Sequence, residues 1–198
     1  MSLIEGDIDT LMLDSSFKRR KNALVYARSI GSAKQKVEIS FYMYHKILHV
    51  YPWLFIYYPE VNEAAYRLLV NNDIAADRAS MNFTIKQPIL MRTDVKTWMF
   101  DDENKRGEIA AQLRAFLKKH TIPLLDDLSS MDGYLTSYEM QDERIIRDDV
   151  QHIFTAAAYA LHGKYEKGYE VLTKRFRKMG RKIYADVFEY FENILQIN

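Results

Sequence analysis

The sequence contains no cysteine among its 198 residues, and only seven glycines and four prolines. Without cysteine the chain cannot form disulfides, zinc ribbons, thiol nucleophiles or iron–sulfur clusters. The seven glycines are scattered and do not form a loop of the kind that cradles phosphates in nucleotide-binding proteins. The lack of cysteine also favours a reducing compartment, so we expect a cytoplasmic protein.

The chain also lacks a large net charge and long apolar runs. The 28 basic and 27 acidic residues leave a formal net charge of +1, which argues against a surface wholly devoted to binding polyanions. No window approaches the ~20 apolar residues that a membrane span needs. The N-terminus, with Glu5, Asp7 and Asp9, lacks the basic start and apolar core of a signal peptide. We therefore expect a soluble protein with no membrane segment.

Core-forming material is abundant, at 48% hydrophobic and 13% aromatic residues. A chain of this length buries roughly 70% of the surface that its unfolded form exposes, so it needs no metal or disulfide to fold. The pattern of residues from about 23 to 100 is typical of strands, whereas that from about residue 101 to the end is typical of helices. We predict one α+β domain over residues 1–198, with an N-terminal antiparallel sheet (about residues 23–100) covered by C-terminal helices (about 101–197).

The individual elements follow from the same periodicity. Val37–Met43 alternates as a half-buried strand, and Leu24–Arg28 is its predicted hairpin partner across a turn at Gly31-Ser32. Further strands are predicted at Trp53–Tyr58, Met81–Lys86 and Val95–Phe100, with a helix at Asn62–Val70. Later helices are predicted around Ile109–Leu117, after Pro123, and at Arg147–Leu161, Tyr165–Met179 and Arg181–Leu195. The predicted core contains Ile39, Phe41, Ile56, Phe83, Leu113, Phe116, Leu125, Ile153 and Phe191.

An alanine-rich run at residues 156–160 precedes Gly163. Small side chains let two helices approach closely, and glycine permits a tight turn between them. One such hairpin resembles a single tetratricopeptide repeat, but a solenoid needs about three copies and this chain has one. We expect the run to serve packing within the domain.

The densest positive cluster is Lys18-Arg19-Arg20-Lys21, followed by Arg28, Lys34 and Lys36. Lys18, Arg19, Arg20 and Lys21 are the candidate contacts for an anion or nucleic acid, with Tyr26 and Tyr42 as stacking surfaces. The alternative is a solvated strand flank, whose lysines keep a sheet edge from pairing with other chains. The shortness of the run and the neutral composition favour this alternative.

No motif predicts catalytic, cofactor-binding or metal-binding residues, because HExxH and GxSxG are both absent. Two sets contain metal-ligand residue types, namely His45 with His49, and Asp148 and Asp149 with His152. Neither has a third ligand placed by its spacing, and pairs such as Asp149 with His152 more often lie on a helix surface.

Three functions stay open. The first is a non-enzymatic binding protein, an immunity-type inhibitor or an adaptor, because the 14 tyrosines suit a protein interface, although strand composition explains them equally well. The second is nucleic-acid or phosphate binding through Lys18–Lys21. The third is an enzyme in which a pocket brings His152 or His162 near an aspartate. We expect instead that the C-terminal helices cover the sheet face completely and leave no pocket there, with all five histidines at the surface. The oligomeric state is left open.

Three segments together resemble a bacterial α+β family that is catalogued only as a domain of unknown function. They are Phe17-Lys18-Arg19-Arg20-Lys21-Asn22 leading to Val25, then Trp98 with Ile122-Pro123-Leu124-Leu125-Asp126, and the alanine-rich helix with Gly163-Lys164-Tyr165-Glu166. The resemblance spans roughly Leu11–Arg175. It implies a leading helix, a twisted antiparallel sheet and C-terminal helices. Ser16 stands where the family usually has glycine, and residues 62–80 look like an insertion. Some similar small proteins are immunity proteins beside toxins, which is an analogy of fold.

Overall fold

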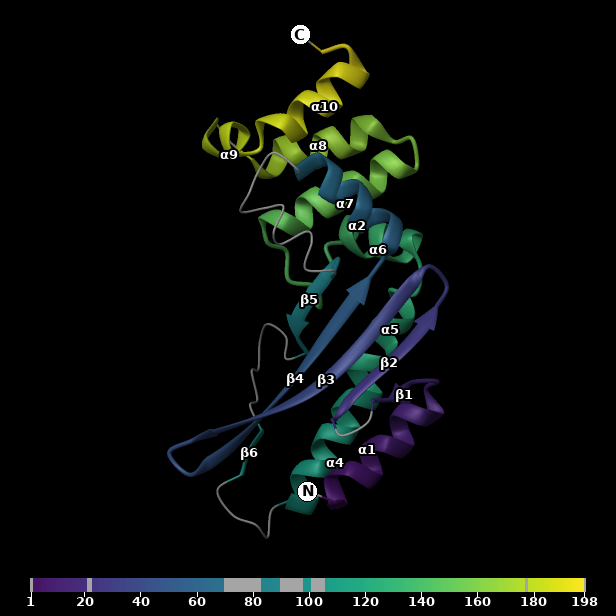
Figure 1. Ribbon diagram of the computed structural model, residues 1–198, viewed down its shortest axis with the longest axis vertical. Helices are drawn as coiled ribbons and strands as arrows, with labels where there is room; N and C mark the ends of the chain where they lie inside the picture. The colour runs from purple at the N-terminus through teal and green to yellow at the C-terminus, as the bar shows by residue number, and fades with distance from the viewer. Residues whose placement is uncertain are drawn as a thin grey trace. The chain divides into compact units, whose positions relative to one another are not determined.

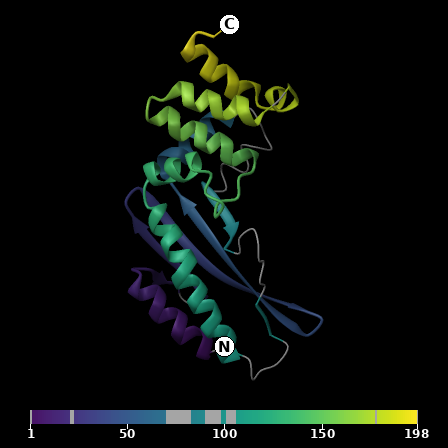
Figure 2. The ribbon, with the colours of Figure 1, turned by 180° about the vertical axis from the view of Figure 1, so that it is seen from behind.

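The structure is a computed structural model, drawn in Figure 1 and from behind in Figure 2. It describes residues 2–20, 23–69, 83–89, 98–100, 106–176 and 178–197. An antiparallel sheet is followed along the chain by helices, so the predicted α+β class is confirmed.

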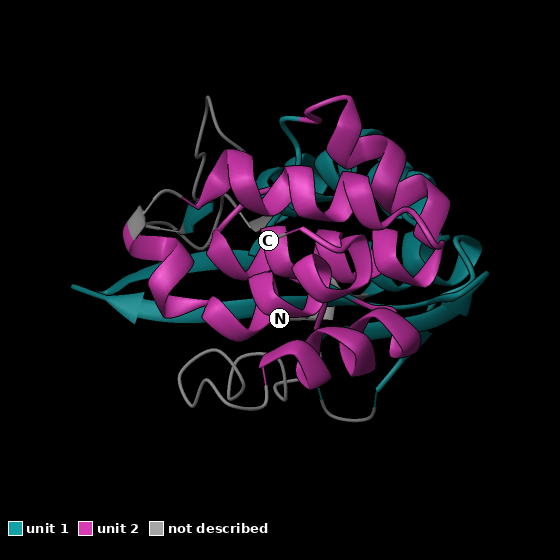
Figure 3. Cartoon of the chain, turned by 90° about the horizontal axis from the view of Figure 1, so that it is seen from above, with its two compact units in different colours: residues 1–56, 86–130, 143–145 teal, residues 57–85, 131–142, 146–198 magenta. Residues whose placement is uncertain are grey.

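The chain divides into two compact units, coloured separately in Figure 3. Unit 1 contains residues 1–56, 86–130 and 143–145, and unit 2 contains residues 57–85, 131–142 and 146–198. Each unit therefore combines segments that are far apart in the sequence. The organisation of residues 1–198 as a single domain stays a prediction.

The sheet has the strand order β1-β2-β3-β4-β5, with β6 also pairing with β4. Its strands are β1 (Lys18–Arg19), β2 (Val25–Ile30), β3 (Ala33–Tyr44), β4 (Ile47–Tyr57), β5 (Ile85–Pro88) and β6 (Trp98–Phe100). The predicted hairpin is confirmed, because β2 pairs with β3 from Val25↔Glu38 to Ile30↔Ala33. Gly31, at φ 55° in its turn, is required there, since a Cβ atom would collide with the Ser129 carbonyl.

The two faces of the sheet differ in unit 1. Buried Gln35, Val37 and Ile39 of β3 alternate with Lys36 and Glu38, which are only half-buried. The helical segments of unit 1 lie on one face of the sheet, as Figure 2 shows. This is the face of the buried residues, because Gln35 donates to the carbonyls of Leu125 and Leu128. They are α1 (Ser2–Asp14), α4 (Arg106–Phe116), the π-helical turn η2 (Leu117–Thr121) and α5 (Ile122–Asp127). None of these described helical segments covers the opposite face.

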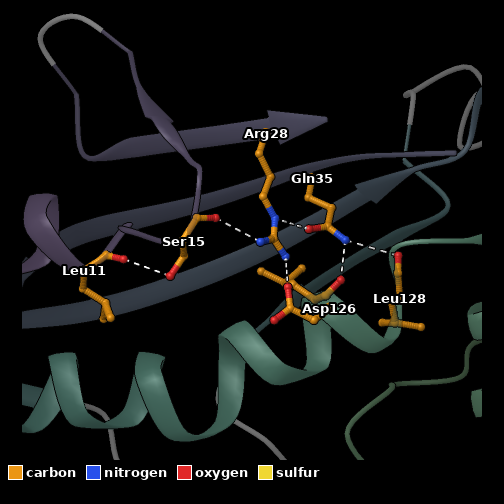
Figure 4. Close-up of polar contacts among 7 residues, drawn as sticks. Leu11, Ser15, Arg28, Gln35, Asp126 and Leu128 are labelled. Carbon is orange, nitrogen blue, oxygen red and sulfur yellow. Dashed lines mark hydrogen bonds and ion pairs between the residues drawn. The ribbon is translucent and has the colours of Figure 1, made fainter. Parts of the chain in front are cut away.

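Arg28 of β2 binds three neighbouring segments at once (Figure 4). Its guanidinium donates to the Gln35 side chain at 2.8 Å, to the Ser15 carbonyl at 3.0 Å and to the Asp126 carboxylate at 2.5 Å. The side chain is 6% exposed and also lies over the Phe17 ring. Although Arg28 belongs to the positive cluster in the sequence, it is an internal cation that ties α1 and α5 to the sheet.

Unit 2 is a helical cluster around α7 (Asp149–Leu161), which is buried along most of its length. The other helices are α2 (Pro59–Leu69), α6 (Met131–Glu139), α8 (Tyr165–Arg175), α9 (Lys178–Ile183) and α10 (Ala185–Leu195). A Cβ atom on Gly168 of α8 would lie 2.6 Å from the Phe191 ring and 3.1 Å from the Ala156 carbonyl. The small residues thus permit the close helix packing that the alanine-rich run predicted.

Several predictions need correction. The helix predicted at Tyr165–Met179 ends at Arg175, because Phe176 is extended, and α9 begins separately at Lys178. The last helix begins at Ala185 rather than at Arg181. The strand predicted at Met81–Lys86 is found at Ile85–Pro88, and residues 81, 82 and 95–97 of the predicted strands lie outside the described residues. Three members of the predicted core, Phe41, Phe83 and Phe116, are only half-buried.

Ser16 ends α1 in a conformation that favours glycine. Its φ is 66°, and the two N–H groups that follow the helix turn back, Ser16 to the Leu13 carbonyl and Phe17 to that of Met12, both at 2.9 Å. This is a helix C-terminus of the left-handed type. The Phe17 side chain is thereby brought into the core, where it is 1% exposed.

We expect Ser16→Gly to raise the free energy of unfolding by about 1 kcal/mol, because glycine adopts this φ without steric cost. Urea unfolding of the two proteins measures the difference. Ser16→Ala, which keeps the Cβ atom, is the matched control and should show no gain. Equal stability of the glycine and alanine variants would contradict the prediction.

Candidate functional site

The predicted cluster Lys18–Lys21 does not act as one basic surface in the structure. Arg19 faces inwards, and its Nη1 atom lies 2.6 Å from the Asp9 carboxylate of α1. Lys18 and Arg20 are exposed, and Lys21 lies outside the described residues. Lys18 and Arg19 form the short edge strand β1, as the solvated-flank interpretation expected. Anion binding here stays a prediction that rests on fewer side chains.

The stacking surface expected beside this cluster is also changed. Tyr26 is fully buried, and its hydroxyl donates to the Asp9 carboxylate at 2.6 Å. It therefore offers no ring to a ligand. Tyr42, by contrast, is 58% exposed on β3.

In the two candidate metal sets, the aspartates have structural roles. The Asp148 carboxylate accepts the N–H of Gln151 and caps α7, and Asp149 pairs with Arg175 at 2.7 Å. His45 lies in the β3–β4 turn and His49 within β4. Among the described residues, no group of three or more histidine, aspartate or glutamate side chains is placed to hold a metal ion.

A cleft in unit 2 is the strongest candidate site. It lies among α6, α7 and α8, and its volume is about 430 Å³. This combination of a concavity with convergent polar and titratable groups is typical of ligand sites. The lining residues are Tyr138, Glu139, Gln141, Arg147, His152, Tyr159, Lys167, Glu170, Val171, Lys174 and Arg175.

His152 is the central titratable group of the cleft. The Tyr138 hydroxyl lies 2.5 Å from its Nδ1 atom, and Phe176 packs edge-on against its ring at 6.5 Å. Burial, and after it the positive charge of Arg175, lowers the pKa of His152 from 6.5 to about 4. The imidazole is therefore uncharged at neutral pH.

Most of the charged groups in the cleft are paired. Lys167 lies 2.6 Å from Glu139, and Lys174 lies 2.6 Å from Glu170. The Tyr159 hydroxyl donates to Glu139 at 2.7 Å. The hydrogen bonds from Lys167 and Tyr159 hold the pKa of Glu139 below its usual value. These pairs leave little net charge on the α8 side of the cleft.

Arg147 is different from the other cations. Its guanidinium packs 5.3 Å from the Tyr138 ring, and one Nη2 hydrogen bond reaches the Asp142 carbonyl at 3.3 Å. The Nε atom is buried without a hydrogen-bond partner. Within the described part of the chain, Arg147 makes no ion pair with a carboxylate. Since Arg147 lines the cleft, an anion bound there would pair with a guanidinium that no described carboxylate neutralises.

The expectation that all five histidines lie at the surface is wrong for His152, and His49 is half-buried as well. The spacing of Asp148, Asp149 and His152 predicts a surface pair on a helix, whereas the structure packs His152 against Tyr138 and Phe176. Local sequence patterns could not predict the burial of His152, because its partner Tyr138 belongs to α6, a helix that the sequence did not predict.

A second concavity of unit 2, with a volume of about 520 Å³, lies among α2, α7 and the C-terminal helices. Alanine and leucine side chains form much of its lining, and its charged pair Arg67–Glu63 is exposed. It offers no group with an altered pKa comparable to His152, apart from a raised pKa of Tyr190 caused by burial. The cleft of His152 is therefore the better candidate.

Comparisons with protein-family models, with curated protein sequences and with solved structures gave no match. The resemblance to the α+β family of unknown function thus stays a prediction. None of the described helices combines the length and the apolar character needed to cross a membrane.

The lowered pKa of His152 predicts a specific pH dependence of stability. Between pH 6.5 and pH 4 the unfolded chain binds a proton at this histidine and the folded protein does not. The free energy of unfolding therefore falls as the pH falls through this window. We expect His152→Gln to lose less stability than the wild type between pH 7 and pH 5, measured by urea unfolding at both pH values.

His120→Gln, which changes an exposed histidine, is the control and should keep the wild-type pH dependence. Carboxylate titration is common to all three proteins and cancels in the comparison. If His152→Gln and the wild type lost equal stability, His152 would not be an uncharged, buried group.

Proposed function

We propose that the protein acts by binding rather than by catalysis, and that the cleft of α6, α7 and α8 holds an anionic ligand with carboxylate or phosphate oxygens. The observation that carries the proposal is Arg147. This guanidinium lines the cleft, makes no ion pair with a carboxylate of the described residues, and packs against the Tyr138 ring. A planar guanidinium matches the geometry of both anions.

His152 adds a neutral donor beside it. When the Tyr138 hydroxyl donates to Nδ1, the proton of the uncharged imidazole resides on Nε2. That N–H group is available to an acceptor without the cost of burying a second positive charge. Lys167, Lys174 and Arg175 of α8 are each paired with a carboxylate, so Arg147 is the cation that the proposal assigns to the ligand.

The altered pKa values support binding over acid–base catalysis. A general acid or base works best when its pKa lies near the operating pH. The pKa of His152 lies far below neutrality, and burial raises the pKa of both Tyr138 and Tyr159. None of these three groups is poised to exchange a proton near pH 7.

The ligand oxygens have two sources in this proposal. A free phosphate or carboxylate compound is one, and an acidic side chain of a protein partner is the other. The second source includes the protein partner and the immunity-type role predicted from the sequence. Both sources share the same contact with Arg147.

We expect inorganic phosphate to bind with a roughly millimolar dissociation constant. The amide and side-chain NMR signals of Arg147 and His152 should shift in a saturable manner during the titration. Acetate tests whether a carboxylate suffices. Arg147→Gln should weaken binding at least ~10-fold, because a hydrogen bond to a charged group contributes about 1.5–3 kcal/mol.

Arg67→Gln is the matched control, since Arg67 is an exposed arginine of the same unit that lies outside this cleft. It should bind phosphate as the wild type does. Shifts that are absent at 50 mM phosphate and acetate, or equal binding by the Arg147 and Arg67 variants, would contradict the proposal.

A further inference from the structure

The face of the unit 1 sheet that its own helices leave open carries a row of aromatic side chains. Tyr42 and Tyr44, at the end of β3, are 58% and 54% exposed. Their rings are stacked, with centroids 6.4 Å apart and planes within 17°. On the neighbouring strand β4 the rings of His49 and Tyr51 are stacked in the same way, at 6.0 Å and 11°.

The two stacked pairs form one continuous surface across the hairpin. Tyr44 meets His49 edge-on, with the ring centroids 6.4 Å apart. His49 also pairs with Met99 of β6, whose side chain is 49% exposed. Tyr42 and Tyr44 are exposed, whereas His49 is half-buried and both of its ring nitrogens are inaccessible.

Lysines lie on the same face as these tyrosines. Side chains alternate along a strand, so Lys34, Lys36 and Glu38 share a face with Tyr42 and Tyr44. Their partners in β2, given by the register, are Ser29, Ala27 and Val25. Lys36 also packs over the Phe55 ring, with its Nζ atom 3.6 Å from the centroid.

The β3–β4 hairpin carries more positive than negative charge. From Ala33 to Tyr57 the sequence contains three lysines, Lys34, Lys36 and Lys46, and a single acidic residue. That residue, Glu38, is already paired with Lys36 at 3.0 Å. The positive charge of this segment contrasts with the neutral chain as a whole and is complementary to a polyanion.

We propose that this aromatic face of the β3–β4 hairpin binds single-stranded nucleic acid. Bases stack on exposed aromatic rings irrespective of sequence, while lysines contact the backbone phosphates. An open antiparallel sheet with exposed rings is a common platform for such binding. From Lys34 to Tyr44 the strand extends about 33 Å, which accommodates several nucleotides. This function is separate from anion binding in unit 2 and uses different residues from Lys18–Lys21.

The test is fluorescence anisotropy of a labelled 12-nucleotide oligo(dT) with the full chain at 50 mM salt. We expect Tyr42→Ala with Tyr44→Ala to weaken binding at least ~10-fold, because each lost stack contributes about a tenfold factor or more. Tyr42→Phe with Tyr44→Phe keeps the rings and should bind as the wild type does. Both tyrosines are exposed, so the substitutions leave the core intact.

The lysine contribution is measured by the salt dependence. Lys34→Ala with Lys46→Ala should reduce the slope of log K against log salt by about 1.4, since each phosphate contact on a single strand contributes about 0.7. The control is Lys118→Ala with Lys119→Ala, which removes two exposed lysines of η2 in the same unit. This control should retain the wild-type slope.

Three outcomes would overturn the proposal. They are no binding at 50 mM salt, equal binding by the alanine and phenylalanine variants, and binding of duplex DNA as tight as that of the single strand. The first would leave the hairpin as a surface for a protein partner. Arg147→Gln should bind oligo(dT) normally, so that failure here and failure of anion binding in unit 2 are distinguished.

Discussion

The buried guanidinium of Arg28 is the constraint on which the arrangement of unit 1 depends. A charge that is removed from water needs acceptors, and Arg28 finds them in the Ser15 carbonyl, the Gln35 amide and the Asp126 carboxylate. Gln35 in turn donates to the carbonyls of Leu125 and Leu128. The network therefore joins the end of α1, the β2–β3 hairpin and α5.

The same network determines which face of the sheet is covered. Arg28 and Gln35 are partners in the β2–β3 register, so both point to the face on which the helices of unit 1 lie. Their alternate neighbours, Ser29 and Lys34, must point the other way. Arg28 and Gln35 find their hydrogen-bond partners on the helix side of the sheet, so the lysines and tyrosines that alternate with them lie on the open face.

Unit 2 uses a comparable device to place its cleft. Gln151 of α7 is buried and donates to the Thr84 carbonyl, while the Tyr134 hydroxyl lies 2.8 Å from Thr155 Oγ1. Desolvation raises the pKa of Tyr134, which stays protonated as part of this network. With Gln151 held inside, the next residue, His152, faces the cleft and meets Tyr138.

The sequence predicted what local periodicity encodes. The alternation over Val37–Met43 correctly predicted a strand, and Gly31-Ser32 correctly predicted its turn. Its buried face ends at Ile39, because Phe41 is half-buried and Met43 is 61% exposed. Helix α1 was implied only by the family resemblance and not predicted from periodicity, although Ile8, Leu11 and Met12 follow a helical spacing and are buried. Helix α6 contains glycine, serine and threonine and gave a weak signal.

The site depended on information that no local pattern contains. Arg28 and Arg19 were grouped with their basic neighbours, but each finds an acidic partner from a distant segment, Asp126 and Asp9. Composition cannot distinguish such an internal cation from a ligand contact. The assignment of His152 to a helix surface failed for the same reason, since burial by α6 and α8 sets its pKa. The cytoplasmic location and the bacterial origin stay predictions.

A double-mutant cycle on Arg28 and Gln35 tests the central claim most directly. We expect Arg28→Met and Gln35→Leu each to lower the free energy of unfolding by about 2–3 kcal/mol, because each leaves buried polar partners unsatisfied. The double variant removes both sides of the hydrogen bond and should cost clearly less than the sum of the two. Additive effects, or single effects below about 0.5 kcal/mol, would show that this network does not hold the helices of unit 1 to the sheet.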